Sequence, residues 1–219
     1  GPAANAAYLL GVWGTRVAFA GLVGDDDAGH RIMSEFRHAG VDVTGLEVRS
    51  GHATPLSIVL VSDRTGSRTI VTHKPPSAPF HLRALVEPPR VLLFDGHELT
   101  ASLEAIERYP GATTILDAGS VREGTLELAR RVDHLVASER FARQVTGLPA
   151  LDAQSERVAA VSRLSQFNNR PVVVTLGRRG LVHGTADRVE YLPAFPARTV
   201  DTTAAGDIFH VAFAHGVAI

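Results

Sequence analysis

Cysteine is absent from the 219-residue chain, so disulfide bonds and catalysis by a thiolate are both excluded. A strong charge of either sign is also lacking, because the formal net charge is -1 at pH 7, and this gives no reason to expect a nucleic-acid partner. No apolar run reaches the roughly 18 residues that a membrane-spanning helix needs, so no membrane partner is expected. With 45% hydrophobic and 21% charged residues, the composition is that of an ordinary soluble globular protein.

Motifs of two other protein classes are missing as well. No G-x-G-x-x-G follows an early strand, which leaves little support for a dinucleotide-dependent oxidoreductase. The ten histidines show no H-x-x-x-H spacing, so we expect no structural zinc site. Asp25, Asp26 and Asp27 are adjacent, but a run of acids offers no ligand geometry and suits the start of a helix better. We therefore expect no metal-ligating residues in the chain.

From residue 91 onwards, short apolar segments alternate with helical patterns. The expected strands are 91–94, 114–117, 135–136 and 172–175, and the expected helices are 103–109, 125–132, 139–145 and 155–167. Such alternation predicts a parallel sheet covered by helices on both faces. Ligands of these sheets bind beyond the carboxyl ends of the strands. Polar residues gather at those ends, at 95–97, 117–120, 138–139 and 175–177, and this convergence predicts a nucleotide site.

The N-terminal part of the chain gives weaker patterns. Residues 1–7 predict a loop of small residues that opens an apolar helix at 8–10, ended by Gly11 or Gly14. A buried strand is expected at 17–21, and residues 41–47 are expected to be irregular.

Three further elements follow the acidic run. A helix with Ile32, Met33 and Phe36 on one face is expected first, and strands at 56–61 and 68–73 then flank a turn at 63–66. The prolines within residues 74–79 predict a loop.

Near the C-terminal end, small residues lead into an apolar helix. Ala204, Ala205 and Gly206 have almost no side chain, so a ligand can approach their backbone N–H groups closely. A helix N-terminus suits a phosphate, and it favours the ionised form of Asp207 in its first turn. An anion site beside one carboxylate is what phosphoryl transfer to a hydroxyl needs. Ordinary helix capping explains the same pattern equally well.

The residues 201–207, DTTAAGD, closely resemble the signature D-T-x-G-A-G-D of ribokinase-like (PfkB) carbohydrate kinases, with Ala204 in place of the first glycine. The resemblance implies that Asp207 is the catalytic base and that Ala204, Ala205 and Gly206 form the anion hole. It also implies an α/β, ribokinase-like fold of three layers, with a mostly parallel sheet, helices on both faces and a small β lid. We thus expect a single kinase domain over residues 1–219, incomplete at both ends, with lid strands from about 41–73.

Three residues are expected to bind the substrate. Gly1 and Asn5 match the family's N-terminal G-G-x-x-x-N motif, in which the Asn contacts sugar hydroxyls, although Pro2 departs from the Lys or Asn of many members. A helix-capping amide is the alternative for Asn5. His97 follows a strand end where ketohexokinase-like members place an Arg near the ligands. For His97, a loop residue facing solvent is the alternative.

Four residues are expected to bind the nucleotide. The segment TLGRRG resembles the family's T-x-G-x-x-G, which lies along the ATP phosphates, and this singles out Thr175, Gly177 and Gly180. A hairpin turn there is compatible with that role. Ser138 begins the family's N-x-x-E motif, which is linked to magnesium and phosphate control, but Ser replaces Asn, and Phe141 replaces Glu, so that role is not carried over. Ketohexokinase and sulfofructose kinase, the members nearest in pattern, depart from the motif in a similar way.

The resemblance implies an ATP-dependent kinase that uses ATP and Mg²⁺ and phosphorylates a hydroxyl of a small-molecule sugar, with a ketose or a ketose derivative favoured. It also implies a cytoplasmic protein and leaves a homodimer formed through the lid as an expectation. Two alternatives stay open. One is a non-catalytic relative that binds a sugar or a nucleotide, and the other is a nucleoside or keto-acid kinase.

Overall fold

The computed structural model describes residues 1–62, 68–74, 80–199 and 201–219, which form two compact units. Unit 1 comprises Gly1–Ala6, Glu87–Arg198 and Ala204–Ile219, and unit 2 comprises Ala7–Val86 and Thr199–Thr203. Each unit is described separately below.

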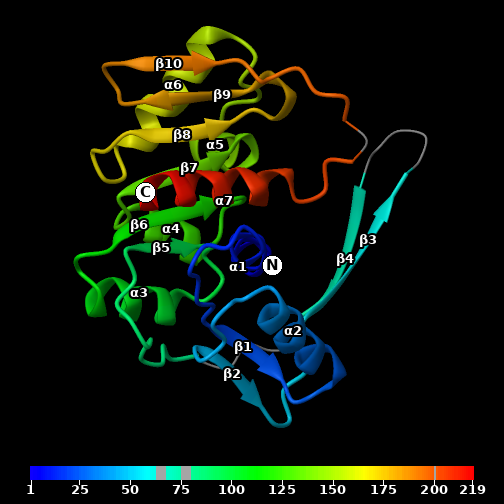
Figure 1. Cartoon of the computed structure of the whole chain (residues 1–219). Coiled ribbons are helices and arrows are strands. Elements are labelled where there is room, and N and C mark those ends of the chain that lie inside the picture. Colours follow the sequence, from blue (N-terminus) through cyan, green and yellow to red (C-terminus); the bar gives the residue numbers. More distant parts are fainter. Residues whose placement is uncertain (63–67, 75–79, 200) are drawn as a thin grey trace. The chain divides into compact units, whose positions relative to one another are not determined.

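A six-stranded sheet with the order β10-β9-β8-β7-β6-β5 forms the centre of unit 1 (Figure 1). Its strands are β5 (Val91–Phe94), β6 (Thr113–Ala118), β7 (His134–Ser138), β8 (Val172–Thr175), β9 (Leu181–Gly184) and β10 (Val189–Leu192). Strands β5 to β8 are parallel, whereas β9 and β10 are antiparallel to their neighbours. The expected parallel sheet is therefore present, with an antiparallel hairpin at one edge.

Helices cover both faces of this sheet (Figure 1). They are α3 (Leu99–Arg108), α4 (Glu123–Ala129), α5 (Glu139–Thr146) and α6 (Gln154–Ser165) on one face and α7 (Ala205–Ala218) on the other. Under α7 the core is formed by Ile115, Val136 and Ala214, with Phe209 and Phe213 packed against them. This apolar contact fixes α7 on β5 and β6, because burying each such side chain contributes roughly 1.5–3 kcal/mol.

The expected elements of unit 1 are all found, and their ends shift by a few residues. Strands β5 and β8 have the bounds that the apolar runs predicted, while α3 begins at Leu99 rather than at residue 103. The first turn of α3 was missed because it has no side-chain cap.

Unit 2 holds the rest of α1 (Pro2–Val12), then β1 (Gly21–Gly24), α2 (Asp27–His38) and β2 (Leu46–Arg49). Strands β1 and β2 pair in parallel. The acidic run starts α2 as expected, since the Asp26 carboxylate caps the helix by accepting a hydrogen bond from the Gly29 N–H at 2.8 Å. Hydrogen bonds from Thr54 and Gly29 lower the pKa of Asp26 to about 2, the Thr54 hydroxyl contributing most.

Three expectations for the N-terminal part are wrong. Residues 2–7 are helical rather than a loop, because Pro2 fits the first position of a helix and the alanines that follow are strong helix formers. The strand expected at 17–21 begins only at Gly21, and Ala18 makes one isolated bridge to Asp42. Residues 41–47 are not wholly irregular, since β2 begins at Leu46. Both strands are short, and glycines in β1 and charged residues in β2 interrupt the apolar pattern that would have marked them.

Strands β3 (Leu56–Val61) and β4 (Arg68–His73) form a separate antiparallel pair with the bounds that the sequence predicted. The turn expected at 63–66 lies outside the described residues, as does most of the proline-rich loop expected at 74–79. In this pair, large apolar side chains are exposed on β3 and on β4.

Gly29 gives a direct test of the packing in unit 2. A Cβ at this position would lie 2.1 Å from the Gly24 carbonyl oxygen, a backbone atom that cannot move away cheaply. We expect Gly29→Ala to lower the free energy of unfolding by about 2–3 kcal/mol, measured by urea denaturation. As a control, Gly216→Ala in α7 meets no atom within 4 Å and should be neutral or slightly stabilising. Equal stability of the two variants would contradict this packing.

Candidate active site

The last three residues of the DTTAAGD signature, Ala205, Gly206 and Asp207, form the first turn of α7. Ala204 precedes the helix in the left-handed conformation, at φ 60°, which costs a non-glycine residue about 1–2 kcal/mol. The helix begins at Ala205, so the N–H groups of its first turn have no carbonyl acceptor within the helix. Ala205 and Gly206 are exposed, and Asp207 is half-buried. An exposed helix N-terminus thus stands beside a carboxylate.

Helix α1 brings Asn5 to the same place. The Asn5 side-chain amide donates a hydrogen bond to Asp207 Oδ2 at 2.5 Å, across 202 positions of sequence. Asn5 lies inside α1 rather than at its cap, so the alternative of a capping amide is wrong. The structure thus brings together the two residues that the two motifs single out, and the role of Asn5 as a sugar ligand stays a prediction.

The other two expected substrate residues, Gly1 and His97, lie next to Asp95, which follows β5. Its Oδ2 accepts a hydrogen bond from the Ala3 N–H at 3.2 Å, and its Oδ1 accepts one from the His97 N–H at 3.0 Å. Gly1 is also adjacent, since a Cβ at this position would lie 3.6 Å from Asp95 Oδ2. Gly1 and His97 therefore gather around a carboxylate to which the sequence had assigned no role.

A second polar pair, to which the sequence analysis gave no individual role, is buried between β6 and α7. Asp117 of β6 and His210 of α7 have side chains that are 10% and 5% exposed, and Asp117 Oδ2 lies 3.3 Å from His210 Nδ1. Burial raises the pKa of Asp117 to about 6, an effect that His210 opposes and the carboxylates of Asp207 and Asp95 reinforce. Three carboxyl groups, those of Asp95, Asp117 and Asp207, thus act on one another at the carboxyl edge of the sheet.

Ser138 and Thr175 are register partners at the ends of β7 and β8. The Ser138 hydroxyl donates to the Gly119 carbonyl at 2.8 Å and accepts from the Phe141 N–H at 3.0 Å, so it caps α5. Thr175 Oγ1 lies 3.4 Å from the Ala137 carbonyl. Both residues stand where the sheet predicts a nucleotide, and their contact with one stays a prediction.

The segment TLGRRG forms the connection between β8 and β9, closed by a hydrogen bond from the Leu176 N–H to the Gly180 carbonyl at 2.8 Å. Gly177 begins a short 3₁₀ turn, and Gly180, at φ 94°, has no room for a Cβ, which would lie 2.1 Å from the Leu192 carbonyl. The hairpin interpretation of the segment is therefore right, and it leaves the expected phosphate-binding role open.

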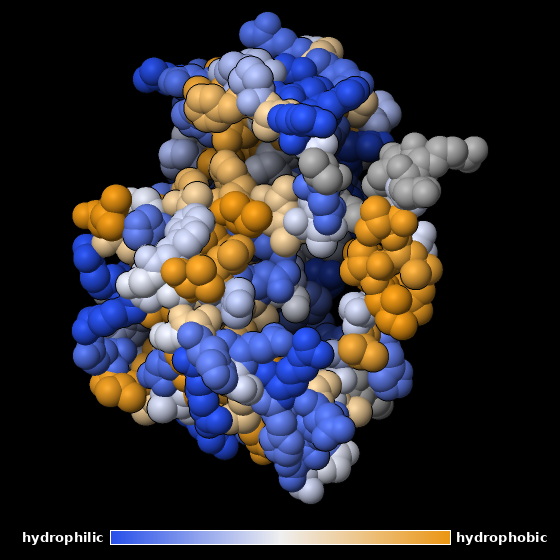
Figure 2. Space-filling view, turned by 45° about the vertical axis from the view of Figure 1, so that its right-hand side comes forward, coloured by the Kyte–Doolittle hydropathy of each residue, from blue (hydrophilic) through white to orange (hydrophobic). Residues whose placement is uncertain are grey.

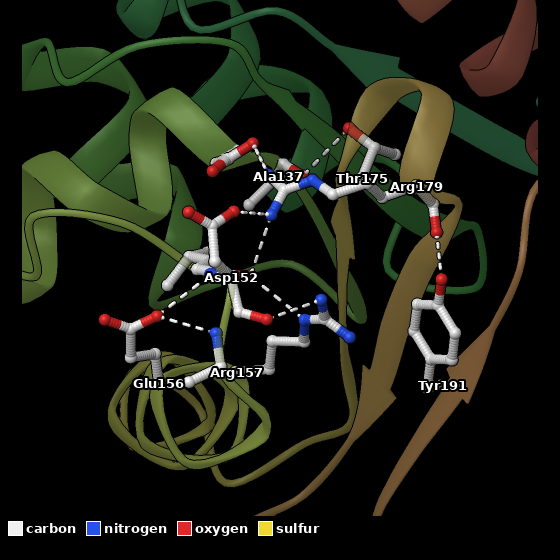
Figure 3. Close-up of polar contacts among 10 residues, drawn as sticks. Ala137, Asp152, Glu156, Arg157, Thr175, Arg179 and Tyr191 are labelled. Atoms are coloured by element: carbon white, nitrogen blue, oxygen red, sulfur yellow. Dashed lines mark hydrogen bonds and ion pairs between the residues drawn. The ribbon is translucent and has the colours of Figure 1, made fainter.

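Arg179 anchors this connection to three other segments (Figure 3). Its guanidinium donates to Glu139 Oε2 at 2.5 Å, to the Leu151 carbonyl at 3.0 Å and to Asp152. Its carbonyl accepts from the Tyr191 hydroxyl. The bond to Glu139 raises the pKa of Arg179, so the guanidinium stays charged. The Gly177–Arg179 turn is thereby held to the first turn of α5, the loop before α6 and β10.

In the part of the chain that the structure describes, no three His, Asp or Glu side chains cluster closely enough to hold a metal ion. Phe141, at the position of the family's glutamate, is fully buried and offers no ligand atom. Over the same residues, no helix is both long and apolar enough to cross a membrane.

The sequence analysis placed Asp95 and Asp117 among the polar residues at the strand ends without giving either an individual role, and it missed His210 as a site residue. Asp95 and Asp117 were visible as polar residues directly after apolar strand runs, the position at which ligands meet such sheets. His210 gave no such signal, because it lies on the apolar stripe of α7, and only the packed structure brings it to Asp117.

Comparison with known proteins gives one family match and several relatives. The sequence matches the family described as "pfkB family carbohydrate kinase" over residues 1–218. A bifunctional ribokinase/ribose-5-phosphate isomerase A from Fructilactobacillus sanfranciscensis is 27% identical, over 95% of this chain and 40% of the relative. A ribokinase from Haemophilus influenzae is 26% identical, over 97% of this chain and 72% of the relative. Fructokinase-1 from Zea mays is 28% identical, over 95% of this chain and 70% of the relative.

Solved structures share the fold. A crystal structure of a protein from Agrobacterium tumefaciens aligns with a TM-score of 0.86 at 30% identity, over 100% of this chain and 72% of that one. Ribokinase from Thermotoga maritima aligns with a TM-score of 0.76 at 24% identity, over 100% of this chain and 73% of that one. These alignments confirm the predicted ribokinase-like α/β fold. The finer resemblance to ketohexokinase and sulfofructose kinase stays a prediction, because the relatives described above are ribokinases and a fructokinase.

The raised pKa of Asp117 predicts how its charge affects stability. Between about pH 4, where the unfolded carboxyl titrates, and about pH 6, the folded protein binds more protons than the unfolded chain, so ionising Asp117 lowers stability as pH rises. Asp117→Asn cannot ionise. We therefore expect its free energy of unfolding, relative to the unmodified protein, to increase by on the order of 1–3 kcal/mol between pH 4 and pH 6.5. Urea denaturation across this range measures the difference, and a difference that does not vary with pH would contradict the assignment.

Proposed function

The chain belongs to the pfkB family of carbohydrate kinases, and from this premise we propose that the protein transfers the γ-phosphoryl group of ATP to a hydroxyl of a sugar. The observation that carries the proposal is the placement of Asp207, a half-buried carboxylate in the first turn of α7, within hydrogen-bond distance of Asn5.

In this reaction Asp207 is the general base. Its carboxylate takes the proton of the sugar hydroxyl while the hydroxyl oxygen attacks the γ-phosphorus, and the bond from that phosphorus to the bridging oxygen of ADP breaks. The N–H groups of Ala205, Gly206 and Asp207 stabilise the charge that develops on the phosphoryl oxygens. Asn5 holds the substrate hydroxyls near Asp207, and Gly1 and His97 complete the sugar side around Asp95.

The nucleotide lies along the carboxyl ends of β7 and β8 in this proposal. Ser138 and Thr175 mark that edge, and the connection with Gly177 and Gly180 follows the phosphates, held in place by Arg179. The chain offers no obvious ligands for Mg²⁺ at the N-x-x-E position, where Ser138 is committed to capping α5 and Phe141 is buried. We therefore propose that the metal ion arrives with the nucleotide phosphates, where it supplies charge neutralisation.

The proposed substrate is a sugar with a free primary hydroxyl, and a ketose or ketose derivative is favoured. Ribokinases and fructokinases are both among the relatives, so the family supports a sugar without choosing between an aldose and a ketose. Departure from N-x-x-E at Ser138 and Phe141, shared with ketohexokinase and sulfofructose kinase, is what favours the ketose. A nucleoside or a keto-acid is the alternative acceptor within the same chemistry.

A relative that binds sugar or nucleotide without catalysis is the second candidate function. The departures at Ser138, Phe141 and Pro2 favour it. The intact Asp207 opposes it, because binding alone does not require a base at the N-terminus of α7.

Strands β3 and β4 are proposed as a lid on a single kinase domain and as the surface of a homodimer. Both faces of this two-stranded sheet expose apolar side chains, among them Ile58 at 55% and Leu60 at 57% on one face and Ile70 at 62% on the other. Figure 2 shows the apolar patch over this sheet. A two-stranded sheet is at best marginally stable alone, and exposed apolar patches of this kind mark interfaces.

The role of Asp207 as the general base is tested in the full-length protein. ADP formation is measured with ATP, Mg²⁺ and a panel of aldoses, ketoses, nucleosides and keto-acids. We expect turnover with at least one sugar, and Asp207→Asn should lower kcat about 10²–10⁴-fold while ATP affinity stays nearly unchanged. Asp187→Asn, an exposed carboxylate in the β9–β10 connection, is the control and should retain full activity. Binding without ADP formation would favour the non-catalytic alternative, and unchanged turnover in Asp207→Asn would refute the role of the base.

The lid surface is tested by sedimentation of the full-length protein at micromolar concentration. We expect a dimer, and Ile58→Lys or Ile70→Lys should shift it to a monomer because each buries a charge in the proposed interface. Val158→Lys, an exposed apolar residue of α6, serves as the control and should leave the dimer intact. If the unmodified protein sediments as a monomer, this interface is wrong.

A further inference from the structure

The buried pair Asp117–His210 has no part in the reaction as proposed above. Its two side chains come from opposite sides of the interface between the sheet and α7, and both are almost fully enclosed. Burying a carboxylate and an imidazole costs free energy unless each is paired. A buried pair this close to Asp207, beside the apolar cluster of Ile115, Val136 and Ala214, calls for a physical reason.

The His210 ring contacts three oxygen atoms. Nδ1 lies 2.7 Å from the Gly206 carbonyl and 3.3 Å from Asp117 Oδ2, and Nε2 lies 3.3 Å from the Val136 carbonyl. Asp117 and Val136 are register partners on β6 and β7, so the ring spans two adjacent strands. Nδ1 faces two acceptors, the Gly206 carbonyl and Asp117 Oδ2, so an N–H at Nδ1 serves both contacts, and the Asp117 carboxylate helps to orient the ring.

The Gly206 carbonyl belongs to the same planar peptide unit as the N–H of Asp207. Fixing the carbonyl therefore fixes the direction of that N–H and the start of the Asp207 side chain. The Asp207 carboxylate and N–H are the two groups that the proposed reaction uses. Packing of Phe209 and Phe213 holds the body of α7. Within the helix the Gly206 carbonyl is also placed to accept the backbone N–H of His210, so the ring adds a second contact to a peptide unit whose own N–H side has no partner in the helix.

We propose, on the basis of the function proposed above, that His210 is a positioning residue for phosphoryl transfer. It acts by holding the Gly206–Asp207 peptide unit in the orientation that aims both the Asp207 N–H and carboxylate at the reacting groups, and the Asp117 carboxylate orients the ring so that Nδ1 faces the Gly206 carbonyl.

The charges around Asp117 make this positioning dependent on pH. The groups that act on Asp117 are His210 and Asp207 from α7, Asp95 from the segment after β5, and Arg122 from the loop after β6. As pH falls through about 6, Asp117 takes up a proton, and His210 Nδ1 then faces a neutral carboxyl group in place of the anionic acceptor that orients the ring. Turnover therefore falls below about pH 6.

Two isosteric substitutions in the full-length protein separate the two ring nitrogens. His210→Asn places an amide N–H near the position of Nδ1, towards Gly206, whereas His210→Gln places it near that of Nε2, towards Val136. We expect kcat of His210→Asn to stay within a few-fold of the unmodified protein and kcat of His210→Gln to fall about 10–100-fold. KM for sugar and ATP should change little in both. The control is His134→Gln, whose ring packs on Phe213 at the far end of α7 and should leave kcat unchanged.

The pH profile of kcat gives the second measurement. Asp117→Asn should lower the plateau and move the acidic limb from about pH 6 to lower pH, which a merely structural role would not do. Equal kcat in His210→Asn and His210→Gln, a loss of equal size in His134→Gln, or an unmoved acidic limb in Asp117→Asn would each overturn the proposal. If neither His210 variant folds, the Asp117→Asn profile decides alone. Absence of turnover in the unmodified protein would instead refute the proposed function, so the two failures are distinguishable.

Discussion

The packing of α7 across β5 and β6 is the contact on which the candidate site depends. Phe209 and Phe213 pack one face of the helix against Ile115 and Val136, and this contact determines the position of the first turn of α7. Because Ala205, Gly206 and Asp207 of the signature lie in that turn, the apolar core sets the position of Asp207 and of the exposed N–H groups beside it. The chemistry of the site is therefore specified by hydrophobic side chains that take no part in it.

Polar contacts then fix the orientation of groups whose approximate position is set by the apolar core. The Asn5 amide contacts Asp207 from one side, and His210 holds the Gly206 carbonyl from beneath. On the expected nucleotide side, Arg179 performs a comparable function for the 3₁₀ turn after β8 through its bonds to Glu139 and Leu151. His210 and Arg179 thus each hold a backbone segment that contains a glycine, Gly206 or Gly177.

The sequence was sufficient to predict the elements whose patterns are local. Strands β3, β4, β5 and β8 have the predicted bounds, because apolar alternation and turn residues mark them without help from distant parts of the chain. Strand β1 was misplaced and β2 was not predicted, because the short segments GLVG and LEVR carry glycines or charged residues in place of a continuous apolar run. The signature identified Asp207 and its neighbours by resemblance. The contacts of Asp95, Asp117 and His210 depend on which helix faces which strand, and no sequence spacing encodes that.

The central claim is that the Asp207 carboxylate and the N-terminus of α7 act together on a sugar hydroxyl and a phosphate. A crystal structure of the full-length protein with the sugar it phosphorylates and a non-hydrolysable ATP analogue tests this most directly. We expect a substrate hydroxyl within about 2.6–3.2 Å of Asp207 Oδ1 or Oδ2, with the terminal phosphate facing the N–H groups of Ala205, Gly206 and Asp207. A sugar bound away from Asp207, or a terminal phosphate that does not approach α7, would contradict the account.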